Sequence, residues 1–423
     1  MKKPLSLLAS LMILTACTTS TPYVHQAVKL KHQLNEPNKQ YGTSNNAVLS
    51  ASYVKALHDF SLDFYDTTDT TTNNAFSPLS IATCFSMLGD GSANKTKEEI
   101  DNMLHYDDSF NHLEDIEKML VRCAIDDPSN DVYLDVAQSI WLADKNSIKE
   151  EYVNKLTDHY FAEAYDHVPF NTDEGKQLIA DWINQKTKDF LDVKKEQFND
   201  LNGLTKLVLL NALYAKSPWG IDKLFPEKNN YDSSFYNRDG TTTNKKFMVG
   251  KVERGTYYEE EKYVISSLPY KCGMQINILL PNKGEESILS NKEAINKLIN
   301  YDKLDNCLTN DIKWRLPLFK ITKNYDLVEN LSKLGLEETL SSAPDFSAMT
   351  DLPKGMLYIK SLQHGAGIEI DNVGVKAASY TYVHVGSKAA PAPEFEINVD
   401  HPFAYYLTTS EGLPLMLGTV NNF

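Results

Sequence analysis

The chain has 423 residues, with 42 Lys and Arg against 57 Asp and Glu, so its net charge is −15. An acidic chain lacks the basic surface that phosphate backbones require, which argues against nucleic acid as a partner. Its 19 Gly and 17 Pro residues are near average usage, and its hydrophobic fraction is 42%. Collagen-like and low-complexity proteins are thereby excluded, and a globular protein with a large core is expected.

Residues 1–16 predict a lipoprotein signal peptide. Lys2 and Lys3 precede an apolar run of about ten residues, whereas a membrane-spanning helix needs about twenty. The run ends in Leu14-Thr15-Ala16-Cys17, which is similar to the bacterial lipoprotein box, where cleavage precedes a cysteine that receives the lipid. We therefore expect an exported protein that is anchored through Cys17 at the outer membrane, facing the periplasm or outward. A simple signal peptide with an incidental cysteine is the alternative.

Residues 17–48 are predicted to be the lipidated N-terminus and a flexible tether. From Thr18 to about Val48 the chain is polar, with no helical or alternating period of apolar residues. After it, no second linker and no internal repeat interrupt the sequence. We therefore expect one large domain over residues 49–423.

The elements predicted along this domain are helices first and strands later. Apolar residues recur at helical spacing in 49–65, and Ser77-Pro78 is a start signal for a helical segment over 77–104 with a break near 89–94. Residues 206–215 are almost all apolar, as in a strand covered on both faces. Segregated helices and strands indicate the α+β class. Further helices are expected at 112–124, 147–162 and 174–191, and further strands at 263–269, 274–281 and in the last sixty residues.

Motifs for catalysis and metal binding are missing from the sequence. It contains no G-x-S-x-G, H-E-x-x-H, G-x-G-x-x-G or EF-hand pattern, and its ten His residues form no i, i+4 ligand pair. Cys84, Cys123, Cys272 and Cys307 stand far apart without C-x-x-C pairs, so no zinc site is predicted. We expect neither a metal nor another cofactor. Pairing among these cysteines is left open, because export would permit disulfides.

The segment 374–393 has an alternating pattern that stands out in the C-terminal part of the chain. A strict period of two lets one set of side chains lie on a core while the other meets water, so the segment is able to form a strand. Pro391 and Pro393 cannot donate ladder hydrogen bonds and keep its end extended and exposed. Counting from Val375, every second residue is small or β-branched and uncharged, and we call these residues the inward set. The residues between them include all the bulky and charged ones, and we call these the outward set. The inward set is Val375, Ala377, Ser379, Thr381, Val383, Val385 and Ser387, and the outward set is Lys376, Ala378, Tyr380, Tyr382, His384, Gly386 and Lys388.

Several motifs, in order along residues 49–423, resemble those of the serpin family. Each motif alone is weak, but their order and spacing make chance agreement negligible. The matching stretches are Asn73 to Ile81 (NNAFSPLSI), Asn211 to Trp219 (NALYAKSPW), Leu316-Pro317 with Ile321 and Tyr325-Asp326-Leu327, Asp345-Phe346-Ser347, Ile397 to Phe403 (INVDHPF) and Leu417 to Val420 (LGTV).

The resemblance implies the serpin fold, with about nine helices, three β-sheets, a large central sheet A and an exposed reactive-centre loop at about 374–393. It implies an inhibitor of serine proteases that acts as a suicide substrate. The cleaved loop inserts into sheet A as an extra strand while the protease is still attached as an acyl-enzyme. Such an inhibitor needs no catalytic group of its own, so we expect a protein that is not an enzyme. We also expect a monomer.

The resemblance also assigns site residues by position. His364 precedes Gly374 by ten residues and Lys388 follows it by fourteen, which places the cleaved bond between Lys388 and Ala389. A lysine there suits trypsin-like proteases, whose specificity pocket carries a buried carboxylate. The implied hinge is Gly374, Val375, Lys376, Ala377, Ala378, Ser379 and Thr381, the shutter that gates sheet opening is Ser77, Ser80, Asn211 and His364, and the breach where insertion starts is Trp219.

Some positions depart from the family pattern. Asn372 stands where an acid is usual, and Leu318 stands where its basic partner is expected, so both halves of one ion pair are missing together. The stretch from Gly374 to Pro402 is about three residues longer than in common plasma serpins, which leaves the cleaved bond open: Tyr382, Val385 or Ala389 could serve other serine or cysteine proteases. The main alternative is a non-inhibitory serpin acting as a binding or structural module. If the protein were an enzyme, the alternative would be a lipid-anchored surface hydrolase.

Overall fold

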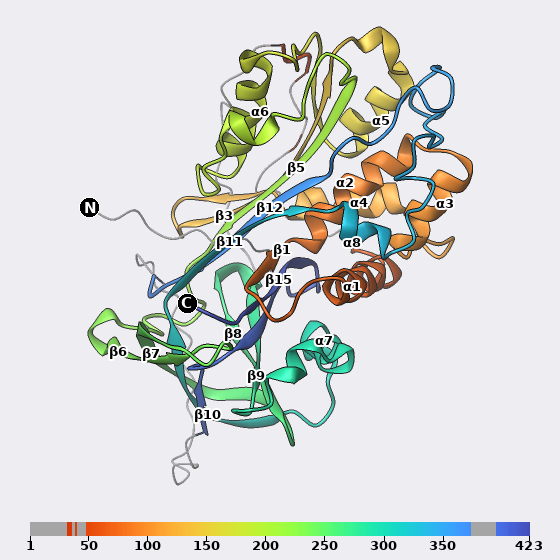
Figure 1. Cartoon of the computed structure of the whole chain (residues 1–423). Coiled ribbons are helices and arrows are strands. Elements are labelled where there is room, and N and C mark those ends of the chain that lie inside the picture. The colour runs from red at the N-terminus through yellow and green to blue at the C-terminus, as the bar shows by residue number, and fades with distance from the viewer. Residues whose placement is uncertain (1–31, 36–38, 40–47, 374–394) are drawn as a thin grey trace.

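The computed structural model describes residues 32–35, 39, 48–373 and 395–423 (Figure 1). Within these residues the chain forms eight α-helices, close to the nine that the serpin resemblance implies. The helices are α1 (Ala51–Asp66), α2 (Pro78–Asp90), α3 (Asn94–Met103), α4 (His112–Arg122), α5 (Glu150–His159), α6 (Asp173–Lys186), α7 (Lys292–Ile299) and α8 (Val328–Ser332). The 3-10 turns are η1 (Lys145–Ser147), η2 (Lys195–Phe198), η3 (Glu227–Asn229), η4 (Lys271–Gly273), η5 (Glu286–Ser290) and η6 (Tyr301–Lys303).

Local signals set the start of several helices. The Ser77 hydroxyl accepts the Ser80 N–H at the start of α2, and Pro78 occupies the first helical position, where no N–H is needed. Residues Ser50, Asn111, Thr172 and Asn291 cap α1, α4, α6 and α7 in the same way. The predicted break near 89–94 is confirmed, because α2 ends at Asp90 and α3 begins at Asn94.

The strands form three hydrogen-bonded ladders. The first has nine strands in the order β1-β15-β14-β9-β8-β7-β10-β13, with β6 on β7; the second is β2-β3-β4 with β5 on β3; and the third is β11-β12. Their bounds are β1 (Asn74–Phe76), β2 (Ile125–Asp127), β3 (Val132–Leu142), β4 (Glu163–Tyr165), β5 (Leu207–Lys216), β6 (Tyr231–Tyr236), β7 (Thr242–Glu260), β8 (Tyr263–Pro269), β9 (Gln275–Pro281), β10 (Leu308–Pro317), β11 (Phe319–Asp326), β12 (Gln363–Ile370), β13 (Phe395–Asn398), β14 (Phe403–Thr408) and β15 (Pro414–Val420).

The expected central sheet is present in two parts. β3 and β5 pair antiparallel from Tyr133↔Lys216 to Leu142↔Leu207, and β11 pairs with β12 from Phe319↔Ile370 to Asp326↔Gln363. Among the described residues no ladder joins β5 to β12. In Figure 1 these long strands cross the molecule, with α2, α3 and α4 to one side and the nine-stranded sheet with α7 below. The strand predicted at 206–215 is therefore confirmed, but its first half is only partly buried.

Two apolar cores support this arrangement. The main core runs through α1, α2, the nine-stranded sheet and the lower face of the central strands. A smaller core lies between α6 and the ladder of β2 to β5, where the Trp141 ring stacks on Tyr165 at 3.8 Å and meets Trp182 of α6 edge-on. Buried Glu163 accepts hydrogen bonds from the indole of Trp182 and the hydroxyl of Tyr165, which fastens α6 to β4. α6 and this ladder thus form one packed unit.

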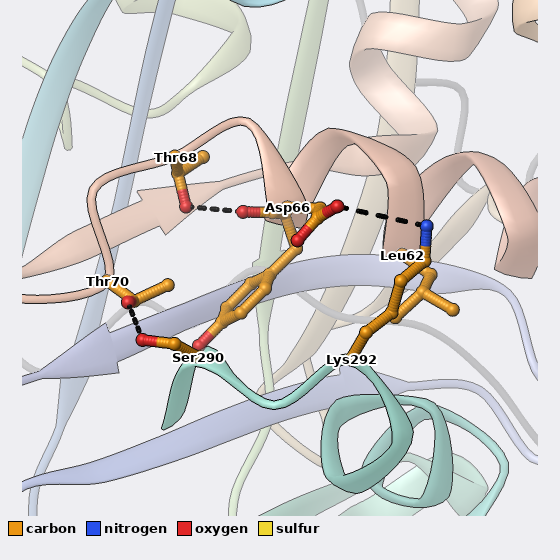
Figure 2. Close-up of a pocket in the computed structure, with 7 residues that line it drawn as sticks. Leu62, Asp66, Thr68, Thr70, Ser290 and Lys292 are labelled. Atoms are coloured by element: carbon orange, nitrogen blue, oxygen red, sulfur yellow. Dashed lines mark hydrogen bonds and ion pairs between the residues drawn. The ribbon is translucent and has the colours of Figure 1, made fainter. Parts of the chain in front are cut away.

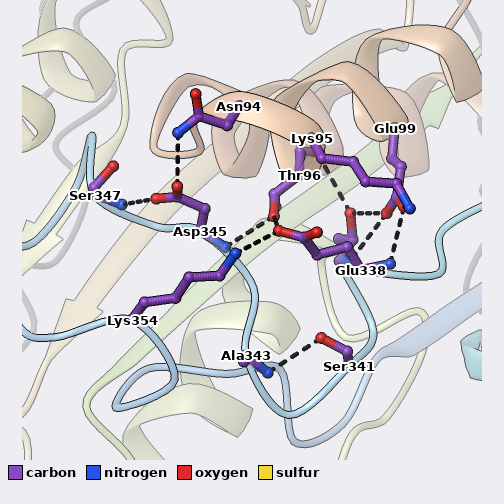
Figure 3. A network of polar contacts seen from close by, with 11 residues as sticks. Asn94, Lys95, Thr96, Glu99, Glu338, Ser341, Ala343, Asp345, Ser347 and Lys354 are labelled. Atoms are coloured by element: carbon purple, nitrogen blue, oxygen red, sulfur yellow. Dashed lines mark hydrogen bonds and ion pairs between the residues drawn. The ribbon is translucent and has the colours of Figure 1, made fainter.

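Polar contacts hold the long connection between α8 and β12 against α3 (Figure 3). The Glu99 carboxylate accepts the N–H groups of Glu338 and Thr339 at 2.9 and 2.8 Å, and hydrogen bonding to the carboxylate keeps the pKa of Glu99 low. Thr96 Oγ1 accepts the Asp345 N–H at 2.8 Å. This connection, which contains no α-helix or strand, is thus held against α3 and leads into β12.

Candidate functional site

The boundary between β5 and β12 is the candidate site, because it is where the central sheet lacks a ladder. Just beyond the C-terminal ends of the two strands, the Trp219 indole N–H donates to the Asp371 carbonyl at 3.1 Å. Before their N-terminal ends, Lys360 and Ser361 both bond Asp200. The two strands therefore run in the same direction. A chain that turned back after β12 would lie antiparallel to both, which is the favourable pairing for a close connection.

The first turn of α2 connects these strands through all four residues predicted as the shutter. The Ser77 N–H donates to His364 Nε2 on β12 at 3.1 Å. The Ser80 hydroxyl donates to Asn211 Oδ1 on β5, and its N–H donates to Ser77 Oγ. Asn211 Nδ2 is buried with no hydrogen-bond partner among the described residues. The backbone N–H of Ser77 and the hydroxyl of Ser80, on one helix turn, thus hold two strands that are not joined by a ladder.

The protonation state of His364 follows from its place in this group. Burial lowers the pKa of His364 to about 4, and no charged group contributes to the shift. The ring faces the Ser77 N–H, a donor that disfavours protonation of Nε2, and lies tilted against the Tyr325 ring. The neutral imidazole accepts through Nε2, and protonation there would remove the Ser77 bond.

We expect stability to fall as pH falls from about 6.5 to 4. The unfolded chain takes up a proton on His364 near pH 6.5 but the folded chain only near 4, so acid favours unfolding by at most about 3 kcal/mol. Urea unfolding at several pH values measures this effect. Because burial also lowers the pKa of His58, the contrast with His364→Gln isolates the shutter residue. Equal pH dependence in both chains would contradict the prediction.

The predicted breach residue Trp219 lies in a packed aromatic group at the far end of β5. Its ring stacks on Tyr270 at 4.5 Å and meets Phe225 edge-on at 5.1 Å. Asn372, where the family pattern has an acid, pairs with Asn230: the two side-chain amides exchange hydrogen bonds of 2.6 and 2.8 Å. Asn372 Nδ2 also donates to the Phe225 carbonyl at 2.9 Å. Asn372, the position where an acid was expected, is therefore held by a neutral amide, Asn230, and not by an ion pair with residue 318.

Sequence reasoning missed Asn230. The replacement for the missing ion pair has no local signal, because Asn230 is 142 residues away from Asn372 and carries no charge that would mark it as a partner.

Replacing Asn372 by Ala should lower the free energy of unfolding by about 1–3 kcal/mol, because three hydrogen bonds are lost and the amide of Asn230 is left without its partner. Urea unfolding monitored by tryptophan fluorescence measures the loss. Asn229→Ala, an exposed amide in the same turn, is the matched control and should change stability by less than about 0.5 kcal/mol. An equal effect of the two changes would show that the amide pair has no specific role.

The other predicted site residues lie outside the described part of the chain. These are Cys17, the hinge residues Gly374, Val375, Lys376, Ala377, Ala378, Ser379 and Thr381, and the reactive bond Lys388 and Ala389. For the loop that contains the hinge and the reactive bond, the structure places only the elements on either side. β12 ends at Ile370, and β13 begins at Phe395 and pairs in parallel with β10. Their roles stay predictions.

The remaining features of the described residues concern metal ligands, membrane-spanning helices, cysteines and cavities. They contain no cluster of metal-ligating side chains and no helix long and apolar enough to span a bilayer. Cys84, Cys123 and Cys307 are free thiols, and burial raises the pKa of Cys84 and of Cys123 to about 12, which disfavours their thiolate forms. A small cavity of about 90 Å³ lies between the end of α1 and η5 (Figure 2), with Thr70 and Ser290 hydrogen-bonded across it.

Comparisons with known proteins agree with this geometry. The family model described as "Serpin (serine protease inhibitor)" matches residues 55–423. Iripin-1 of Ixodes ricinus is 30% identical over 371 residues, covering 83% of this chain and 89% of its own. The mouse leukocyte elastase inhibitor A is 26% identical over 364 residues, covering 82% and 93%. The crystal structure of Serpin48 of the insect Tenebrio molitor superposes with a TM-score of 0.72 at 25% identity, covering 90% of this chain and all of that one.

The chain therefore belongs to the serpin family, and the predicted α+β serpin fold is confirmed. Family members include serine protease inhibitors, which are not catalysts.

Proposed function

We propose that this protein is a suicide-substrate inhibitor of trypsin-like serine endopeptidases, which traps the protease as an acyl-enzyme by inserting its cleaved loop between β5 and β12. One observation supports this above the others. β5 pairs only with β3, and β12 only with β11, so each strand has an edge without a ladder partner among the described residues. The candidate loop follows β12 in the chain, so after cleavage it would reach that boundary by turning back.

The alternation in the loop suits this place. Each inward residue is small or β-branched, so it fits a face that packs on the core, and each charged residue belongs to the outward set. About a dozen inserted residues would gain roughly 1 kcal/mol per backbone hydrogen bond, in addition to apolar burial. That sum is comparable to the whole stability of a domain, about 5–15 kcal/mol. It is large enough to displace a covalently attached protease and distort its active site.

Lys388 is the proposed specificity residue, with cleavage before Ala389. Its ammonium group would enter a pocket that carries a buried carboxylate, where it would form a charge-assisted hydrogen bond. The name of the mouse relative, leukocyte elastase inhibitor A, supports protease inhibition in general but identifies no target of this chain.

The test is covalent trapping of trypsin. Mixing equimolar protein and trypsin should give an adduct that survives heat and detergent on a denaturing gel, with release of a peptide that begins at Ala389. Lys388→Glu should reduce the rate of adduct formation by at least about 100-fold, because it puts like charges together in the pocket. Complete cleavage without an adduct would favour the alternative of a non-inhibitory binding module. Turnover of a substrate by the protein alone would favour a hydrolase.

The proposed location is the cell envelope, with the protein lipid-anchored at Cys17 and monomeric. The residues that support the anchor are the short apolar run and the Leu14 to Cys17 motif. Incorporation of labelled palmitate that disappears in Cys17→Ser tests it.

A further inference from the structure

Residues 32–35 and Lys39, called here the edge segment, lie against the outer edge of the ladder formed by β2 to β5. Gln33 forms an antiparallel bridge with Tyr165 of β4. The Leu34 N–H donates to the Ala164 carbonyl at 2.8 Å, and the Asp166 N–H donates to the His32 carbonyl at 3.1 Å. They form an isolated antiparallel bridge of the kind with which an added strand begins, although the sequence of this region predicts a flexible tether.

Side chains of the edge segment satisfy the remaining polar groups of that edge. The Asn35 amide accepts the Ala164 N–H at 2.7 Å and donates to the Ala162 carbonyl at 3.1 Å. Further along, Lys39 Nζ bonds the Asp135 carboxylate at 2.5 Å and the Val136 carbonyl at 2.8 Å, both on β3. The side chains of Lys39 and Asp135 are only 6% and 5% exposed, so this is a buried ion pair and not a surface contact.

We propose that the outer edge of β4 and β3 is a strand-binding surface and that its occupant is the edge segment of the same chain. An open sheet edge presents unpaired N–H and C=O groups that attract other strands, and proteins cover such edges. Here the cover is built from backbone pairing, one bidentate amide and one buried cation. The edge segment therefore belongs to the folded domain, and it ties the N-terminal region to the packed unit of β2 to β5 and α6.

The position of this surface has a consequence for the anchor. With a lipid on Cys17, the linker between membrane and fold is residues 18–31, which reach at most roughly 50 Å when fully extended. A tether to residue 48 would reach roughly 110 Å. The edge segment thus keeps the folded protein within about one domain diameter of the membrane.

Native-state hydrogen exchange on the full chain with Cys17→Ser tests the proposal through the amides of Ala164 and Asp166, whose acceptors lie in the edge segment. Leu34→Pro removes the Leu34 N–H, and Lys39→Ala removes the buried ammonium group. Each should accelerate exchange of both amides by at least about tenfold, while the β3 and β5 amides stay protected.

Matched controls separate this from a general loss of stability. Leu34→Ala keeps the N–H and shortens a side chain that is 50% exposed, and Lys55→Ala removes an exposed lysine of α1; both should exchange like the unaltered chain. Asn35→Ala removes the acceptor of Ala164, so its effect is measured at Asp166, which should also exchange faster. Rapid exchange of both amides in the unaltered chain, or no change in Leu34→Pro and Lys39→Ala, would overturn the proposal. None of these results depends on protease inhibition.

Discussion

Replacing Ala377 by Glu should convert the protein from an inhibitor of trypsin into a substrate. Ala377 belongs to the inward set, so insertion between β5 and β12 would force the new carboxylate into the core without a partner. Burying an unpaired charge costs several kcal/mol, which slows insertion until deacylation is faster. We expect the fraction of trypsin trapped to fall from nearly complete to a few per cent, with all of the protein cleaved. Val375→Arg should act in the same way.

The alternation of the loop provides the control for this experiment. Ala378→Glu adds the same charge one residue later, where the side chain would face water, so trapping should persist. The measurement is the ratio of adduct to cleaved protein on a denaturing gel at several inhibitor-to-protease ratios. If Ala377→Glu traps as well as Ala378→Glu, strand insertion cannot be the mechanism.

Cleavage of the loop should raise the midpoint of thermal unfolding by roughly 20 °C or more. Insertion of about a dozen residues adds roughly ten kcal/mol of hydrogen bonding, and each kcal/mol raises the midpoint by about 2 °C in a domain of this size. Nicking the loop with a metalloprotease, which forms no acyl-enzyme and so is not trapped, followed by calorimetry measures the shift. The same bond is cut in Ala377→Glu, so the nicked variant shows what the cut alone does, and its midpoint should rise much less. A nicked native protein that melts no higher than the intact one would rule out stored strain.

Much of the fold is predictable because its signals are local. Ser77 and Pro78 start α2 through a cap that involves neighbouring residues, and the break before Asn94 is visible as a loss of apolar period. The apolar run at 206–215 predicts β5 for the same reason. Its partial burial is not predictable, because it depends on whether β12 pairs with it, and those strands lie about 150 residues apart in the chain.

The candidate site also has a part that the sequence predicts and a part that only the structure shows. The family motifs locate Ser77, Asn211 and His364, but only the structure shows that the first turn of α2 links them. The Asn230 to Asn372 pair and the edge segment carry no local signal, since an isolated Asn or Lys in a polar stretch looks like any solvated residue.

By itself the sequence determined the family, the helix starts and a loop whose alternate residues are free of charge, because capping and periodicity act over a few residues. The tertiary structure decided which strands are left without a partner, which side chains hold them, and that part of the N-terminal region joins the sheet. Those features rest on contacts between distant residues, whose hydrogen bonds and buried charges gain free energy only once the chain has brought them together.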